Sequence, residues 1–227
     1  MQTVSDAIQV VTQGLLFDMD GVLVSSIGSV DRSWKLWAKL YNVPDADNFQ
    51  VPHGVRAMDV IHMLKPEFSE AQAAEGLRVI EQMEVEDTGG LAVLPGAKAL
   101  LSSLPADRWA IVTSATHRLT LARLEAAGLP VPDRLITGDM VQRGKPDPEP
   151  YRRGAELLGL APADCIVVED APSGVGAGLA AGSRVLGVLN THPAEDLEHA
   201  TWIANSLEQV QAHFSGDQLK LQILITR

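Results

Sequence analysis

The chain has 227 residues, of which 46% are hydrophobic and 21% charged, which is typical of a folded globular protein and excludes an intrinsically disordered chain. Its 29 acidic and 18 basic residues give a net charge of −11, which argues against nucleic acid and anionic membranes as partners. A single cysteine, Cys165, rules out a disulfide framework within the chain. Because the chain has neither a targeting signal nor an apolar run of about 18 residues, we expect a cytoplasmic protein, a monomer or weak dimer.

The first apolar run, 14-GLLFD-18, predicts a buried strand, and the strand pattern then disappears until about residue 90. Apolar residues at helical spacing predict three helices in this interval, over residues 29–41, 54–64 and 69–83. The last helix opens with Ser69 and Gln72, the spacing of a capping box. We therefore expect a helical cap over residues 29–92, with 88–96 as the return crossing.

From residue 93 onward, short apolar runs alternate with helical segments. The expected strands are 109–113, 134–137, 165–169, 184–189 and 202–204, and the expected helices are 96–104, 117–128, 149–159, 173–182 and 206–214. Residues 216–227 alternate in polarity and predict an added edge strand. This pattern predicts an α/β fold with a doubly wound, Rossmann-like parallel sheet, whose core comprises residues 1–28 and 93–227.

Polar residues follow the predicted strands, at the edge where ligands bind in open parallel sheets. The first strand leads into Asp18 and Asp20, the second into Thr113 and Ser114, and the fourth into Glu169 and Asp170, while Lys145 lies in the loop after the third. The topology is expected to bring these residues, which are distant in the sequence, to one rim.

Carboxylates that converge in this way repel one another unless a cation neutralises them. Oxygen ligands favour Mg²⁺, and no cluster of histidine or cysteine indicates another metal. A phosphate on such an ion would be held by Lys145 and Ser114. One carboxylate would then attack the phosphorus to form an aspartyl-phosphate, and a second would transfer protons; Asp18 and Asp20 fit these roles.

The motifs 18-DMDGVLVSS-26, 113-TS-114, 143-RGKPDPEPY-151 and 168-VEDAPSG-174 occur in this order. Together they resemble the haloacid dehalogenase superfamily of phosphohydrolases, in the branch with a helical cap after the first strand. The resemblance implies that Asp18 is the nucleophile and Asp20 the general acid and base, and that Ser114 and Lys145 hold the phosphate. It also implies that Asp18, Asp170 and the backbone of Asp20 bind Mg²⁺. Glu169 is either a further direct ligand or a residue that contacts one of the ligands.

The cap segment 52-PHGVRAMDVI-61 is similar to that of phosphatases acting on hexose, deoxyhexose or glycerol phosphates, so the expected partner is a small phosphorylated metabolite. His53 and Arg56 become candidates for substrate contact. Ser25 and Ser26 depart from the Asp-Ser of many relatives.

Other activities stay open beside this one. The first alternative is a phosphomutase that resembles β-phosphoglucomutase. Those mutases carry a histidine in the first cap helix, and the matching position here is Val30, which argues against this alternative. A phosphoglycolate phosphatase is a second alternative, and a receiver-like module that stores phosphate on an aspartate is a third. The acid at Asp20 speaks against carbon–halogen cleavage.

Simpler interpretations exist for each candidate. The aspartates and Ser114 are common residues in turns and helix caps, and Lys145 would be an ordinary solvated lysine. One histidine and one arginine near a helix start, as at His53 and Arg56, are usually surface residues. Trp34 and Trp37 are most simply the apolar face of a cap helix.

Overall fold

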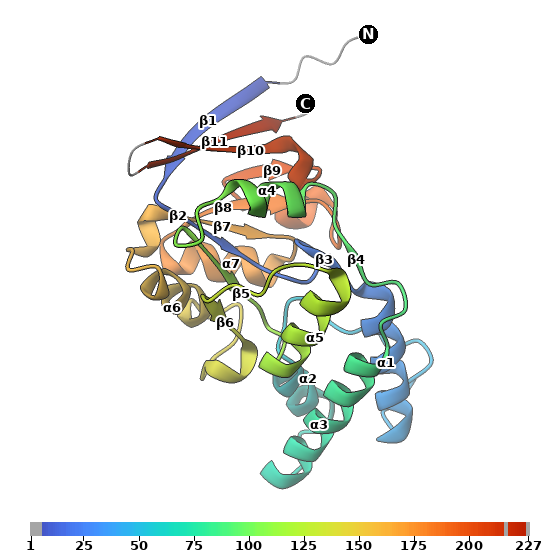
Figure 1. Cartoon of the computed structure of the whole chain (residues 1–227). Coiled ribbons are helices and arrows are strands. Elements are labelled where there is room, and N and C mark those ends of the chain that lie inside the picture. Colours follow the sequence, from blue (N-terminus) through green and yellow to red (C-terminus); the bar gives the residue numbers. More distant parts are fainter. Residues whose placement is uncertain (1–5, 216–217, 226–227) are drawn as a thin grey trace.

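A computed structural model describes residues 6–215 and 218–225, and a parallel sheet runs through its centre (Figure 1). The sheet has six strands in the order β6-β5-β2-β7-β8-β9. Their bounds are β2 (Gly14–Phe17), β5 (Trp109–Val112), β6 (Leu135–Ile136), β7 (Cys165–Glu169), β8 (Arg184–Val188) and β9 (Trp202–Ala204). Every neighbouring pair is parallel. The predicted α/β class with a doubly wound sheet is confirmed.

Both faces of this sheet are buried, which explains why its strands are continuous apolar runs. Successive residues of β2 alternate between the two sides: Leu15 and Phe17 belong to one apolar cluster and Leu16 to the other. The first cluster includes residues of α4 (Ala97–Ser103) and α5 (His117–Ala127). The second includes residues of α6 (Glu149–Leu157) and α7 (Pro172–Ala181). Two pairs of helices therefore cover opposite faces.

The ends of these helices follow local sequence signals. Helix α5 begins after Thr116, whose hydroxyl accepts a hydrogen bond from the Leu119 amide, so Thr116 and not Ser114 is the cap residue. The same helix ends at Gly128, which has the left-handed φ of 64° that glycine allows. Among the helices that the described residues form, none combines the length and apolar character that a membrane span needs.

Three helices form the helical cap: α1 (Ile27–Leu40), α2 (Ala57–Leu64) and α3 (Glu70–Glu86). They share a separate apolar cluster around Trp34 and Trp37, whose side chains are almost fully buried. The Trp37 indole donates a hydrogen bond of 2.9 Å to the Gly76 carbonyl, which joins α1 to α3. The capping box of Ser69 and Gln72 is present at the start of α3. Figure 1 shows the cap at one end of the molecule, beyond the sheet.

The chain enters and leaves the helical cap through two short strands. Strand β3 (Val24–Ser25) pairs antiparallel with β4 (Ala92–Val93), so the outgoing and returning segments lie side by side. The division into core and cap at residues 28 and 92 stays a prediction, and this two-stranded connection lies at both predicted boundaries.

A second sheet covers part of the core, with the order β1-β11-β10 and antiparallel pairing. Its strands are β1 (Asp6–Thr12), β10 (Val210–Ser215) and β11 (Gln218–Ile225). The final segment is therefore a strand as expected, but β11 is central and not an edge. Residues 216–217 and 226–227 of that prediction lie outside the described residues. Leu219, Leu221 and Ile223 are buried in the first apolar cluster of the core.

The helix predicted over residues 206–214 is wrong. Leu207–Gln209 form one 3₁₀ turn, η4, and Val210–Ser215 form β10. Leu207, Val210 and Phe214 are spaced as on one helix face, but Phe214 is 46% exposed and Val210 instead pairs with Ile223 of β11. A short apolar run fits the period of a helix and that of a strand equally well. Here pairing with the distant strand β11 makes the segment a strand. The other 3₁₀ turns are η1 (Gly138–Met140), η2 (Pro162–Asp164) and η3 (Ala194–Leu197).

Candidate active site

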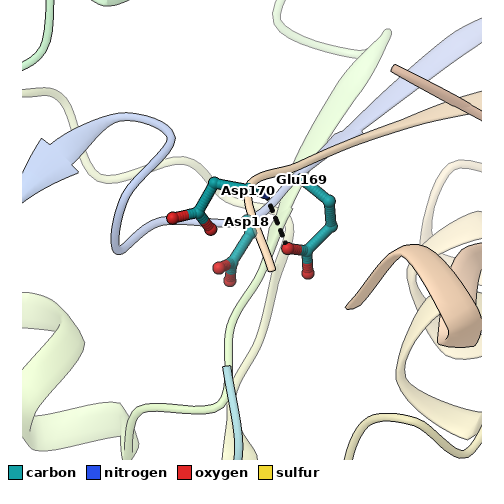
Figure 2. A group of neighbouring side chains, drawn as sticks. All are labelled: Asp18, Glu169 and Asp170. Carbon is teal, nitrogen blue, oxygen red and sulfur yellow. Dashed lines mark hydrogen bonds between the residues drawn. The ribbon is translucent and has the colours of Figure 1, made fainter. Parts of the chain in front are cut away.

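Two neighbouring strands, β2 and β7, bring three of the predicted acidic residues together. Asp18 follows β2 directly, Glu169 is the last residue of β7, and Asp170 comes next. Because β2 and β7 are parallel neighbours, their carboxyl ends lie at one edge. One carboxylate oxygen from each of Asp18, Glu169 and Asp170 lies within 4.8 Å of the other two (Figure 2). All three side chains are buried, and the acidic cluster is able to hold a metal ion.

Lys145 is the cation beside this cluster. Its ammonium lies 2.8 Å from Asp18 Oδ1 and 2.6 Å from Glu169 Oε1, and its side chain is only 1% exposed. It is therefore a buried residue of the site and not a solvated loop lysine. Burial alone would lower its pKa, but Asp18 and Glu169 raise the pKa above its ordinary value, so Lys145 stays protonated.

Both carboxylate oxygens of Glu169 accept hydrogen bonds. Oε1 accepts from the Tyr151 hydroxyl at 2.6 Å as well as from Lys145, and Oε2 accepts from the backbone amides of Asp170 and Ala171. Figure 2 shows the carboxylate folded back toward the Asp170 amide. This arrangement orients Lys145 toward Asp18. Tyr151 has no obvious sequence signal beyond its place in the 143–151 motif.

The acidic cluster carries more negative charge than Lys145 balances. Burial raises the pKa of Asp18 to about 7, against an ordinary value of 3.8, with Lys145 opposing the rise and Glu169 adding to it. Burial, followed by Glu169 and Asp18, raises the pKa of Asp170 well above its ordinary value. A divalent cation would remove this penalty, and the ligands on offer are all oxygens. The residues therefore fit a hard cation such as Mg²⁺.

Two glycines allow the acidic residues to approach one another. Gly21 has a left-handed φ of 80°, as expected for a sharp turn after Asp20, and a Cβ there would overlap the Asp170 carboxylate. A Cβ at Gly174, in the first turn of α7, would overlap the Glu169 carboxylate.

The side chain of Asp20 has separate partners. Its Oδ1 accepts a hydrogen bond of 2.6 Å from the Ser26 hydroxyl, and its Oδ2 lies 2.7 Å from Arg123 Nη1. Ser26, the second residue of the Ser25-Ser26 pair, thus contacts Asp20. Arg123 was not among the predicted site residues; the available signal was an arginine next to Leu124 on the apolar face of a helix. On its other side, Arg123 contacts Glu84 of the helical cap.

Ser114 and Arg56 both join the cap to the core. The Ser114 hydroxyl donates a hydrogen bond of 2.8 Å to the carbonyl of Gly54, in the cap segment before α2. Arg56 Nη1 donates to the core carbonyl of Val141 at 2.9 Å, and its other nitrogens bind Asp59. Arg56, expected as a substrate contact, therefore has protein partners on every side of its guanidinium.

A pocket of about 770 Å³, open solvent at its mouth included, lies between the cap and the core. Its walls include, from the core, Asp18, Asp20, Ser114 and Asp170, and, from the cap, Val30, Trp34, His53 and Glu84. His53 is half-buried and its pKa is lowered, mainly by burial. A small molecule bound in this pocket would have its phosphate at the strand ends and its other end against the cap.

Several known proteins are similar in sequence to this chain. A family model of haloacid dehalogenase-like hydrolases matches residues 12–182. Hexitol phosphatase A from Escherichia coli is 42% identical over 200 residues, which cover 87% of this chain and 93% of that protein. Glycerol-1-phosphate phosphohydrolase 2 from Saccharomyces cerevisiae is 32% identical over 194 residues, which cover 81% of this chain and 77% of that protein.

A solved structure shares the fold. The crystal structure of a hydrolase from Pseudomonas syringae aligns with a TM-score of 0.77 at 24% identity, covering 86% of this chain and 94% of that one. At this identity the likeness concerns the arrangement of sheet and cap, and not the reaction.

Proposed function

The chain belongs to the haloacid dehalogenase-like hydrolases, and from this premise we propose that it is a phosphatase of small phosphorylated sugars or polyols. The observation that carries the proposal is the buried Asp18 carboxylate, which lies beside Lys145 at a strand end and lines the pocket under the cap. A carboxylate in this position can reach a phosphate held at the rim.

In the first step, a carboxylate oxygen of Asp18 attacks the phosphorus of the substrate. The bond from phosphorus to the sugar oxygen breaks, and Asp18 becomes an aspartyl-phosphate. Asp20, which also lines the pocket, gives a proton to the departing oxygen, so the sugar leaves as an alcohol.

In the second step, a water molecule attacks the phosphorus of the aspartyl-phosphate. Asp20 takes a proton from this water, and the bond between phosphorus and Asp18 breaks. Inorganic phosphate is released, and both carboxyl groups return to their starting states. The reaction is thus the hydrolysis of a phosphate monoester, with Asp20 giving and then recovering one proton.

Mg²⁺ is the proposed cofactor, with the Asp18 and Asp170 carboxylates and the backbone carbonyl of Asp20 as its ligands. When bound, Mg²⁺ supplies positive charge that balances these carboxylates and the phosphate oxygens. We assign Glu169 to holding Lys145 in place, because both of its oxygens already accept hydrogen bonds.

Lys145 and Ser114 are the proposed phosphate-binding residues. Lys145 offers a protonated amine next to the nucleophile. The Ser114 hydroxyl now donates to the Gly54 carbonyl, so it must turn from the cap to contact a phosphate. Phosphate binding and the position of the cap loop are therefore linked through one hydroxyl.

Selectivity is proposed to lie in the cap wall of the pocket. His53 keeps its predicted role as a candidate for contact with the sugar or polyol, because it lines the pocket. Arg56 is reassigned to anchoring the cap on the core. Val30 also lines the pocket, so a valine and not a histidine faces the site from α1, which favours hydrolysis over a mutase reaction.

The test is a measurement of phosphate release from purified protein with Mg²⁺. Hexitol phosphates, glycerol phosphate, deoxyhexose and hexose phosphates and phosphoglycolate are compared at equal concentration. We expect kcat/KM to be highest for a hexitol or other polyol phosphate. Release no faster than that by Asp18→Asn, for every compound, would overturn the proposal.

β-Glucose 1-phosphate separates hydrolysis from phosphomutase activity. The proposal predicts free phosphate as the product, whereas a mutase would produce glucose 6-phosphate.

A further inference from the structure

Arg123 is the cation of a second buried group of charges. Its Nη1 lies 2.7 Å from Asp20 Oδ2, and its Nη2 lies 3.2 Å from Glu84 Oε1. The side chains of Arg123 and Glu84 are 4% and 6% exposed, whereas that of Asp20 is 26% exposed and reaches the pocket. Arg123 comes from core helix α5 and Glu84 from cap helix α3, so the contact crosses from the cap to the core.

The direction of the Asp20 carboxylate is set by two contacts, one on each oxygen. Ser26 holds Oδ1, and Arg123 holds Oδ2. The Arg123 guanidinium bridges Asp20 and Glu84, so its ion pair with Glu84 holds it in the orientation that reaches Asp20. Burial raises the pKa of Glu84 to about 7, and Arg123 opposes this rise, so the carboxylate of Glu84 depends on Arg123 in turn.

Given the proposed function, in which Asp20 is the general acid, we propose that Arg123 is a positioning residue that aims Asp20 into the pocket, and that Glu84 of the cap holds Arg123 for this purpose. The proton donor is then correctly placed only while α3 of the cap lies against α5 of the core. A residue of the cap thereby acts on the chemistry through Arg123, without itself touching the reacting atoms.

A purely structural role for Arg123 is the rival explanation, because two ion pairs across the cap and core would also stabilise their contact. Arg118 supplies a matched control. It lies on the same helix α5, and its Nη1 is 3.0 Å from Glu81 Oε2 on the same helix α3. This ion pair also joins cap and core, but Asp20 is not among its partners.

The leaving group of the substrate separates the two explanations. An alcohol such as glycerol is a poor leaving group and needs a proton in the first step, whereas nitrophenolate leaves readily without one. Loss of acid positioning therefore slows aspartyl-phosphate formation from glycerol phosphate but not from p-nitrophenyl phosphate. Damage to the pocket or to the contact between cap and core slows both.

The experiment measures the rate of aspartyl-phosphate formation by rapid quench, with Mg²⁺, for glycerol phosphate and p-nitrophenyl phosphate. For Arg123→Met we expect a loss of about tenfold to a hundredfold with glycerol phosphate and less than about threefold with p-nitrophenyl phosphate. Arg123→Lys should recover part of the loss, and Arg118→Met should change neither rate by more than about twofold.

Asp20→Asn sets the reference pattern. We expect it to show the same dependence on the leaving group, and Arg123→Met should slow the Asp20→Asn protein no further, because both changes remove one function. If Asp20→Asn shows no such dependence, the acid role of Asp20 fails, and this inference fails with it. If Asp20→Asn shows it and Arg123→Met slows both substrates equally, only the positioning role of Arg123 is overturned.

Glu84→Gln provides the test if Arg123→Met does not fold. Glutamine keeps the size of Glu84 and an oxygen acceptor but removes the charge that holds Arg123. We expect a selective loss of about threefold to tenfold with glycerol phosphate. Equal effects on both substrates, or none on either, would overturn the coupling from the cap to Asp20.

Discussion

The protein contains two buried groups of charged residues, and they differ in the parts of the fold that they join. Lys145 with Asp18 and Glu169 lies wholly within the core, at the carboxyl edge of the parallel sheet. Arg123 with Asp20 and Glu84 joins the core to the helical cap. In the first group, Asp18 and Glu169 are held by the paired strands β2 and β7. The second group depends on how two separately packed units meet.

This difference assigns distinct tasks to the two groups. Residues of the sheet edge are fixed by the backbone ladder, which suits a nucleophile and a metal site that need constant geometry. The contacts of residues between cap and core change when the cap moves, which suits a catalytic step that must wait until substrate is bound. The predictions below test this contrast, in order of decreasing effect.

The largest effect is expected at the nucleophile. Asp18→Asn keeps the shape of the side chain but replaces the nucleophilic carboxylate with a neutral amide, so turnover should fall by at least about a thousandfold. Phosphate release with Mg²⁺ measures this, and circular dichroism checks that the variant is folded. A variant that kept more than about a tenth of the activity would show that Asp18 is not the nucleophile.

Removal of the Lys145 cation should cost the most stability. Lys145→Met leaves Asp18, Glu169 and Asp170 buried without it, and the loss in unfolding free energy should be about 3–5 kcal/mol by urea denaturation without metal. Added Mg²⁺ should recover part of it. Arg143→Met is the control, because Arg143 lies two residues away with a side chain that is 73% exposed. A loss below about 1 kcal/mol for Lys145→Met would contradict the buried charge balance.

The Glu84 carboxyl predicts a pH effect for the second group. Its pKa is about 7 in the folded protein, against an ordinary value of 4.5, with Arg123, Asp20 and Glu81 as its charged neighbours. Between these values the folded protein binds a proton that the unfolded chain has lost, so stability falls as pH rises from about 4.5 to about 7. Glu84→Gln should reduce this fall by up to about 3 kcal/mol. Urea unfolding near pH 5 and pH 8, with EDTA, compares the two proteins; equal falls would refute the prediction.

The smallest effect is expected at the exposed ion pair of the same two helices. Arg118 has a side chain that is 52% exposed, so solvent screens its contact with Glu81. Arg118→Met should lower the unfolding free energy by less than about 1 kcal/mol. Thermal unfolding compares the stability lost in this variant with that lost in Arg123→Met. The difference measures how much more a buried ion pair between cap and core stabilises the protein than an exposed one. A larger loss for Arg118→Met would reverse the expected order.

The core and the sheet edge could be predicted because simple periodic rules govern them. Apolar runs ending in Asp18 and in Glu169 and Asp170 predict buried parallel strands, and parallel strands place their ends together whatever the helices do. Lys145 follows from the same rule, through the loop after the third predicted strand. The placement of the acidic residues and that of Lys145 can both be inferred without knowing where the cap lies on the core.

The contacts between cap and core could not be predicted in this way. Arg123 and Glu84 meet because α5 lies against α3, and Arg56 finds the Val141 carbonyl because the cap loop lies against the core. Helical periodicity says which face of a helix is apolar but not which helix covers it. The wrong helix at 206–214 has a related cause, since β10 depends on pairing with β11.

The pairing of β1 with β11 has a consequence for synthesis of the chain on the ribosome. Asp6 pairs with Ile225, so the segment of β1 must wait for a segment that is synthesised much later. Val10 and part of the core surface stay uncovered until Leu219, Leu221 and Ile223 arrive. Such distant pairing slows folding and leaves apolar surface open to aggregation in the meantime. Nascent chains halted before residue 218 should therefore be held by chaperones far more than chains that include β11.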